Sequence, residues 1–69
     1  MKNPFNCGKE IGENLIDEGY LEATSLNSIQ QHQEDAADFA RSHFPEENEE
    51  DQATVAAGMM HAWGQHIRE

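Results

Sequence analysis

The side chains in this sequence that are best suited to bind a metal ion or to transfer a proton are its four histidines. On helical projections, His32 and His43 lie within the apolar side of one predicted helix, and His66 lies within that of the next. His32 and His43 are eleven residues apart, which is about 16 Å along a helix axis, so they cannot share one ion. His61 and His66 are five residues apart, whereas two ligands on one helix need a spacing of about four. We therefore expect the histidines to border the core or an interface, with a pH-sensitive pair of His32 and His66 as the functional alternative.

No arrangement of residues in the sequence points to catalysis. Cys7 could act as a nucleophile only if the fold brought a histidine base to it, and a small, partly buried side chain is the simpler interpretation. Catalysis by paired carboxylates needs a cleft that raises the pKa of one of them, and carboxylates on exposed helix faces lack such a cleft. We therefore expect a protein that is not an enzyme and that holds neither a metal ion nor another cofactor.

Acidic side chains dominate the composition, with 14 aspartates and glutamates against 4 lysines and arginines and a formal net charge of −10. The electrostatic field of this negative charge repels phosphate groups, so neither nucleic acid nor an anionic membrane is expected to bind directly. It attracts basic protein surfaces, including the grooves of proteins that hold nucleic acid. The candidate partner-binding carboxylates are Glu34, Asp35, Asp38, Glu46, Glu47, Glu49, Glu50 and Asp51. The alternative is that acidity only keeps a small protein soluble and monomeric.

Aromatic and methionine side chains provide a second candidate surface, because they are favoured at the centres of protein interfaces. Met59 and Trp63 belong to the apolar stripe of the last predicted helix, and packing in the core explains them equally well. The better candidates for contact with another chain lie nearer the edges of the apolar faces: Phe5, Tyr20, Phe44 and Met60.

The elements that position these residues are predicted to be helices joined by short turns. Asn3-Pro4 is typical of a helix start, and Gly19 is placed to end that helix in a left-handed conformation. Gly8 and Gly12 fall on its apolar face, and each glycine inside a helix costs about 1 kcal/mol relative to alanine. We therefore expect another backbone to approach this helix closely, the alternative being a short, fraying helix in which the glycines have no role.

Two further helices are predicted after the first. One begins with Thr24 or Ser25 as its cap and runs to about Phe44, because Pro45 forbids its continuation. The other begins at Asn48, and its apolar stripe consists of Val55, Ala56, Met59, Ala62, Trp63 and Ile67.

The chain has room for one domain, which we place at 1–69. The predicted fold class is all-α: a small three-helix bundle of two longer antiparallel helices and a shorter N-terminal helix. A single cysteine rules out an internal disulfide and suits a reducing compartment. No apolar run approaches the roughly 20 residues of a membrane span, and the N-terminus lacks the apolar core of a signal peptide. We therefore expect a cytoplasmic protein, in the host cytoplasm if a phage encodes it.

Two hypotheses of function follow from these patterns. The first is a non-enzymatic binding protein that docks its acidic helical surface on a basic, nucleic-acid-handling partner and inhibits or modulates it. In charge and length the chain resembles the small acidic inhibitors, including nucleic-acid mimics, that phages and mobile elements use against host nucleases and defence complexes. The second hypothesis is a homodimeric helical structural or adaptor protein that buries the glycine face or the Met60 edge against its own copy. A histidine-based sensor of pH or metal is a weaker third.

Overall fold

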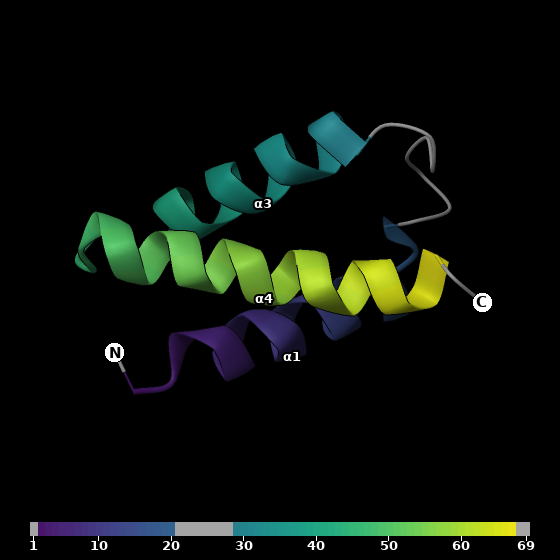
Figure 1. Ribbon diagram of the computed structural model, residues 1–69, viewed down its shortest axis with the longest axis horizontal. Coiled ribbons are helices and arrows are strands. Elements are labelled where there is room, and N and C mark those ends of the chain that lie inside the picture. Colours follow the sequence, from purple (N-terminus) through teal and green to yellow (C-terminus); the bar gives the residue numbers. More distant parts are fainter. Residues whose placement is uncertain (1, 21–28, 68–69) are drawn as a thin grey trace.

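The fold is described by a computed structural model for residues 2–20 and 29–67, and within these ranges it consists of three helices (Figure 1). They are α1 at Pro4–Asp17, α3 at Ile29–His43 and α4 at Glu49–Ile67. In Figure 1, α3 and α4 lie side by side and run in opposite directions, whereas α1 runs in the same direction as α4. The prediction of an all-α, three-helix bundle is confirmed.

The described helices differ less in length than the sequence suggested. α1 has 14 residues, α3 has 15 and α4 has 19. The predicted caps of the second helix, Thr24 and Ser25, lie outside the described residues. None of the three helices is both long and apolar enough to cross a membrane.

The first helix begins and ends as its sequence predicts. The side chain of Asn3 accepts a hydrogen bond from the backbone N–H of Asn6 at 3.3 Å, and Pro4 occupies the first turn. At the other end Gly19 has a φ of 94°, a left-handed conformation that glycine adopts without a steric penalty. Its backbone N–H donates to the carbonyl of Ile16 at 2.9 Å, so the end of α1 is capped.

A tight turn joins α3 to α4. After Pro45 the chain reverses, and the side-chain oxygen of Asn48 accepts a hydrogen bond from the backbone N–H of Asp51 at 2.7 Å. The side-chain amide of Gln52 donates to the carbonyl of Phe44 at 2.8 Å and ties the end of α3 to α4. Three acidic residues, Glu49, Glu50 and Asp51, lie in the first turn of α4, where their negative charges interact favourably with the positive end of the helix dipole. These residues therefore stabilise the start of α4.

Glycines let α1 approach α4 so closely that the two backbones touch. A Cβ atom built on Gly8 would lie 2.0 Å from the carbonyl oxygen of Val55, and one built on Gly58 would lie 2.2 Å from that of Phe5. A Cβ on Gly12 would lie 3.0 Å from the Cβ of Ala62. The expectation of a close backbone approach at Gly8 and Gly12 is therefore confirmed, and the partner is α4 of the same chain.

The core is built on α4, and α1 and α3 pack on it from different sides. The fully buried apolar residues come from α3 and α4: Ala36, Ala40, Val55, Met59, Ala62 and Trp63. The indole N–H of Trp63 donates to the carbonyl of Gly12 at 3.1 Å, a buried hydrogen bond that fixes α1 against α4. In this arrangement the outer side of α3 and the turn before α4 are exposed to solvent.

Candidate partner-binding surface

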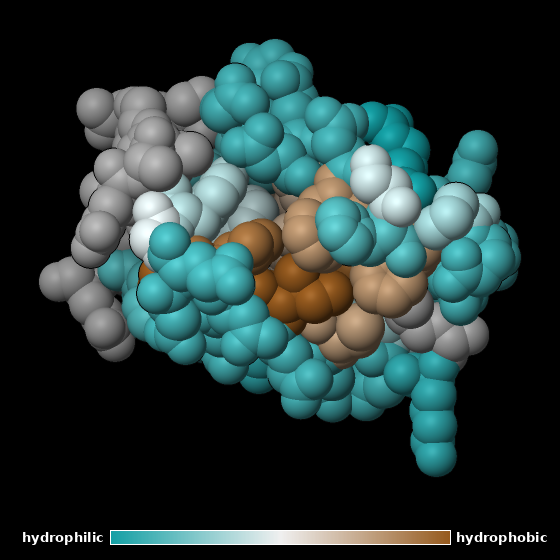
Figure 2. All heavy atoms as spheres, turned by 180° about the vertical axis from the view of Figure 1, so that it is seen from behind, coloured by the Kyte–Doolittle hydropathy of each residue, from teal (hydrophilic) through white to brown (hydrophobic). Residues whose placement is uncertain are grey.

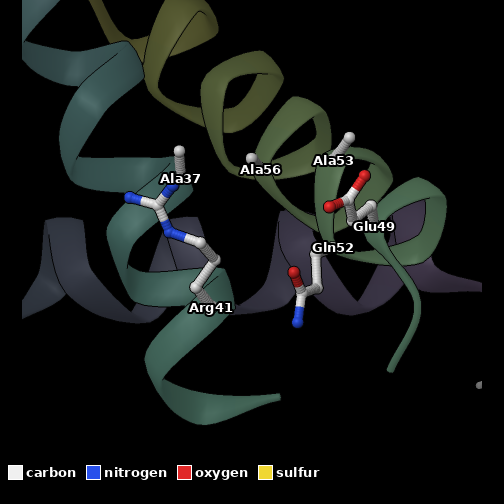
Figure 3. A pocket seen from close by; sticks show the side chains of 6 residues that line it. All are labelled: Ala37, Arg41, Glu49, Gln52, Ala53 and Ala56. Carbon is white, nitrogen blue, oxygen red and sulfur yellow. The ribbon is translucent and has the colours of Figure 1, made fainter. Parts of the chain in front are cut away.

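Two neighbouring hollows lie along α3, and one of them is lined by residues of both α3 and α4. The first has a volume of about 230 Å³ and is shown in Figure 3; its lining consists of Ala37, Arg41, Glu49, Gln52, Ala53 and Ala56. The second has a volume of about 440 Å³ and is lined by Gln33, Glu34, Ala37, Asp38 and Arg41. Because Ala37 and Arg41 belong to both, the hollows adjoin. Together they form one shallow trough. Its part between the helices is lined by three alanines and three polar side chains, and its other part lies along α3 alone.

Five of the eight carboxylates singled out from the sequence are exposed: Glu34, Asp38, Glu46, Glu49 and Glu50. We call these five the α3–α4 acidic surface. Glu34 and Asp38 are one helical turn apart on α3, and Glu49 lies on the opposite side of the trough, at the start of α4. Three carboxylates therefore line the hollows, and two more belong to the turn and the first turn of α4.

Positive charge is scarce on this side of the molecule. Between residues 29 and 67 the sequence contains eight acidic residues and one lysine or arginine, Arg41. The guanidinium of Arg41 pairs with the carboxylate of Asp38, and the two side chains are 65 % and 67 % exposed. A pair this exposed contributes no more than about 1 kcal/mol, so a basic partner could replace Arg41 at little cost.

The other three carboxylates singled out from the sequence lie differently. Asp35 is half-buried and points toward the interior, where it accepts hydrogen bonds from the hydroxyl of Tyr20 at 2.7 Å and from the side-chain amide of Gln31 at 2.9 Å. Glu47 and Asp51 are half-buried at the turn and the helix start. These three contribute less open surface to a partner than the α3–α4 acidic surface does.

The residues of the expected apolar edge do not come together. Phe5 is 36 % exposed at the start of α1, and the centroid of its ring lies 5.6 Å from that of His61. Met60 is half-buried against the core. Tyr20 follows the far end of α1, where its ring stacks on Trp63 with centroids 4.4 Å apart. Tyr20 is therefore engaged inside the molecule, and no single edge joins these residues.

Figure 2 shows that some hydrophobic surface is nevertheless open on the face turned away in Figure 1, where it is surrounded by hydrophilic side chains. Half-buried apolar residues that pack against the core are contributed by α1, α3, α4 and the turn, among them Ile11, Leu15, Phe39, Phe44 and Met60. The glycine face is not part of any open surface, because Gly8 and Gly12 are buried against α4. A second copy of the chain cannot use that face while α1 keeps its place.

A polar network that the sequence did not reveal joins the end of α1 to α3. The hydroxyl of Tyr20 donates to Asp35 and lies 3.0 Å from Nδ1 of His32, whose side chain is only 1 % exposed. Because the single hydroxyl proton goes to Asp35, Nδ1 must carry a proton that it donates to the Tyr20 oxygen. His32 Nε2 is buried and has no hydrogen-bond partner. Burial, the hydrogen bond to Asp35 and the negative charge of Asp35 together raise the pKa of Tyr20 well above its ordinary value.

The remaining histidines are exposed, which corrects the expectation for two of them. His43 and His66 were predicted to lie within apolar sides, but each follows the last fully buried residue of its helix, Ala40 in α3 and Trp63 in α4. The ring of His43 stacks on Phe39 with centroids 3.9 Å apart, and its Nδ1 donates to the Phe39 carbonyl at 3.1 Å. Only His32 is a core histidine within the described part of the chain.

Nothing in the described residues is arranged as a metal centre. Groups of three or more histidine, cysteine, aspartate or glutamate side chains that could hold an ion do not occur in residues 2–20 and 29–67. Cys7 is half-buried on α1 and is a free thiol. The trough between α3 and α4 is therefore the most developed surface feature that the candidate residues share.

Comparison with known proteins identified no relative of this chain. No protein-family model matches the chain, and neither a curated protein nor a solved structure matches it significantly.

Proposed function

We propose that this protein is a non-enzymatic binding module that docks its α3–α4 acidic surface on a basic partner protein and thereby inhibits or modulates that partner. The observation that carries the proposal is the exposure of five carboxylates on α3, on the turn that follows it and on the first turn of α4, with Arg41 as the one lysine or arginine between positions 29 and 67. Four of these carboxylates can meet a partner without breaking a described ion pair, and the fifth, Asp38, would exchange its exposed pair with Arg41 for the partner's charge.

The proposed partner is a protein that handles nucleic acid. Protein surfaces with a strong excess of lysine and arginine are typically those that bind phosphate, and carboxylates spaced along a helix present a comparable row of negative charges. Glu34 and Asp38 are one turn apart, and Glu46, Glu49 and Glu50 extend the charge past the end of α3. A small protein that occupied such a basic groove would exclude the nucleic acid from it.

The proposal is tested by capture of partners from a nuclease-treated cell lysate. The immobilised protein is washed first at low and then at high salt, and the retained proteins are identified by mass spectrometry. We expect one or a few basic proteins that remain at low salt, elute at high salt and are displaced by added DNA or RNA, because all three behaviours follow from binding through charge.

Two results would contradict the proposal. One is recovery of nothing but the immobilised protein, after which self-association measured by sedimentation would become the relevant question. The other is retention of the same proteins by a variant in which Glu34, Glu46 and Glu50 are changed to lysine. Since these three side chains are exposed, their reversal should leave the fold intact, although replacing Glu50 in the first turn of α4 should cost about 0.3–1 kcal/mol of stability. Circular dichroism can verify the fold.

A further inference from the structure

We infer that the trough between α3 and α4 receives an amphipathic helix of the partner, one that carries lysine or arginine together with aliphatic side chains. This inference rests on the proposed function and specifies the kind of segment that the acidic surface would bind. It is carried by the alanines of the first hollow (Figure 3) together with the carboxylates that line this hollow and the adjoining one.

The floor of the trough is made of alanines that come from both helices. Ala37 comes from α3, and Ala53 and Ala56 come from α4. Because these side chains end at Cβ, the space above them is left open between the two helices. The hollow of about 230 Å³ exceeds the roughly 150 Å³ of a cavity that holds a benzene ring, so it has room for an aliphatic side chain.

The rims of the trough carry charges that a basic helix would meet. Glu49 lies on the α4 side, and Glu34 and Asp38 lie on α3, where the second hollow continues the first. Arg41 lines both hollows and pairs with Asp38, so a basic helix would displace its guanidinium from that carboxylate. A helix laid in the trough would place lysines or arginines at intervals of three or four residues on both edges of its apolar stripe. The geometry therefore matches helix-in-groove recognition.

Charge decides which occupant fits. A second copy of the chain would bring another net charge of −10 to the trough, and nucleic acid or an anionic lipid would be repelled in the same way. A neutral apolar segment would partly desolvate the carboxylates of Glu34 and Glu49 without supplying positive charge to them. A cationic amphipathic helix can place aliphatic side chains against the alanines and lysines or arginines beside the carboxylates.

The test uses a synthetic helical peptide of leucine and lysine, as long as α3, in which the leucines form one stripe. A peptide of the same composition with the leucines scattered serves as the control for charge alone. Binding is followed by the amide resonances of the full-length protein in solution. We expect the amphipathic peptide to shift the resonances of Ala37, Ala53 and Ala56, and to bind at least ~10-fold more tightly than the scrambled one.

A matched pair of variants separates the trough from the rest of the surface. Ala53 and Ala57 are both exposed alanines of α4, but only Ala53 lines the trough. We expect Ala53→Phe to weaken binding of the amphipathic peptide at least ~10-fold at every salt concentration, and Ala57→Phe to change it less than ~2-fold. Neither variant alters the charge of the protein.

Three outcomes distinguish this inference from the proposed function. Equal binding of the two peptides, or an unchanged affinity of Ala53→Phe, would overturn docking in the trough, while salt-sensitive capture of a basic partner from lysate would still support the function. Loss of peptide affinity in Ala53→Phe but not in Ala57→Phe would support the trough. Resonance shifts confined to the outer face of α1, around Glu10 and Glu13, would place the site elsewhere and overturn it.

Discussion

The hydroxyl group of Tyr20 connects residues that are distant in sequence and forms the centre of a part-buried polar network. It donates to Asp35 and accepts from His32, while its ring stacks on Trp63. His32 Nε2 remains without a partner, and an orphaned buried nitrogen of this kind costs about 1–3 kcal/mol. The stack and the two hydrogen bonds of Tyr20 offset that cost where the end of α1 meets α3.

Ionisation of Tyr20 should therefore be coupled to unfolding at alkaline pH. Burial, the hydrogen bond to Asp35 and the charge of Asp35 raise the pKa of Tyr20 in the folded protein above its ordinary value of 10.0. Below about pH 10 the phenol is neutral in both states and its contribution to stability is complete. Above that pH the unfolded chain loses the proton and the folded protein keeps it, so stability falls as the pH rises.

The measurement is direct because Tyr20 is the one tyrosine in the chain. We expect the near-ultraviolet absorbance of the phenolate to appear only above pH 10, and to appear near pH 10 in denaturant. In the variant Asp35→Asn the phenolate should appear at a lower pH than in the wild type, because the carboxylate charge has been removed. Ionisation at the ordinary pKa, while the fluorescence of Trp63 still reports a folded protein, would contradict the network.

At the scale of elements, the contact of α1 with α4 is set by Gly8, Gly12 and Gly58. A Cβ at position 58 would lie 2.2 Å from the Phe5 carbonyl oxygen and 2.9 Å from the backbone nitrogen of Lys9. These are backbone atoms, which cannot rotate away as the end of a flexible side chain can. The two helices must therefore separate if any side chain is introduced at Gly58.

We expect Gly58→Ala to destabilise the protein by about 1–3 kcal/mol or more, as overpacking does in other cores. Gly64→Ala on the same helix is the matched control, because nothing lies within 4 Å of the Cβ it would add. Because glycine has a lower helix propensity than alanine, Gly64→Ala should stabilise the protein by up to about 1 kcal/mol. Urea denaturation followed by Trp63 fluorescence measures both. Equal effects of the two substitutions would show that the close approach is absent.

The sequence predicted those elements whose determinants are local. Asn3, Gly19 and Asn48 each act on backbone groups within four residues, so helix starts and ends could be read from the chain, and Pro45 marked the end of α3. Gly8 and Gly12 indicated a close neighbour, but the counterpart at Gly58 was missed. The spacing of Gly58 and Ala62, which repeats that of Gly8 and Gly12, was the signal that could have identified α4.

The candidate site was less predictable because it depends on distant residues. Helical projection could place Glu34 and Asp38 outside, but the bonding of Asp35 to Tyr20 spans fifteen positions and no local pattern encodes it. The trough was not predicted either, since alanines such as Ala53 are compatible with a packed or an open groove. Its opening depends on how far apart α3 and α4 lie, which the fold alone determines.

The whole molecule carries a net charge of −10 on a particle whose longest extent is 32 Å, so its carboxylates repel one another across the folded surface. Salt screens this repulsion more in the compact state, where the charges are closer together. We expect the melting temperature at pH 7 to rise by a few degrees as ionic strength increases from ~0.01 M to ~0.15 M. A melting temperature that falls over this range would indicate that attractive ion pairs outweigh the repulsion.

We propose that a partner binds the α3–α4 acidic surface itself and is not merely attracted by the overall negative charge of the protein. The most direct measurement compares the affinity of the captured partner for two triple variants that change the net charge equally. One is Glu34→Lys, Glu46→Lys and Glu50→Lys; the other, on the exposed face of α1, is Glu10→Lys, Glu13→Lys and Asp17→Lys. We expect the first to weaken binding by at least about tenfold and the second by less than about threefold. Equal losses would contradict a local site, and greater loss for the α1 variant would move the interface to that helix.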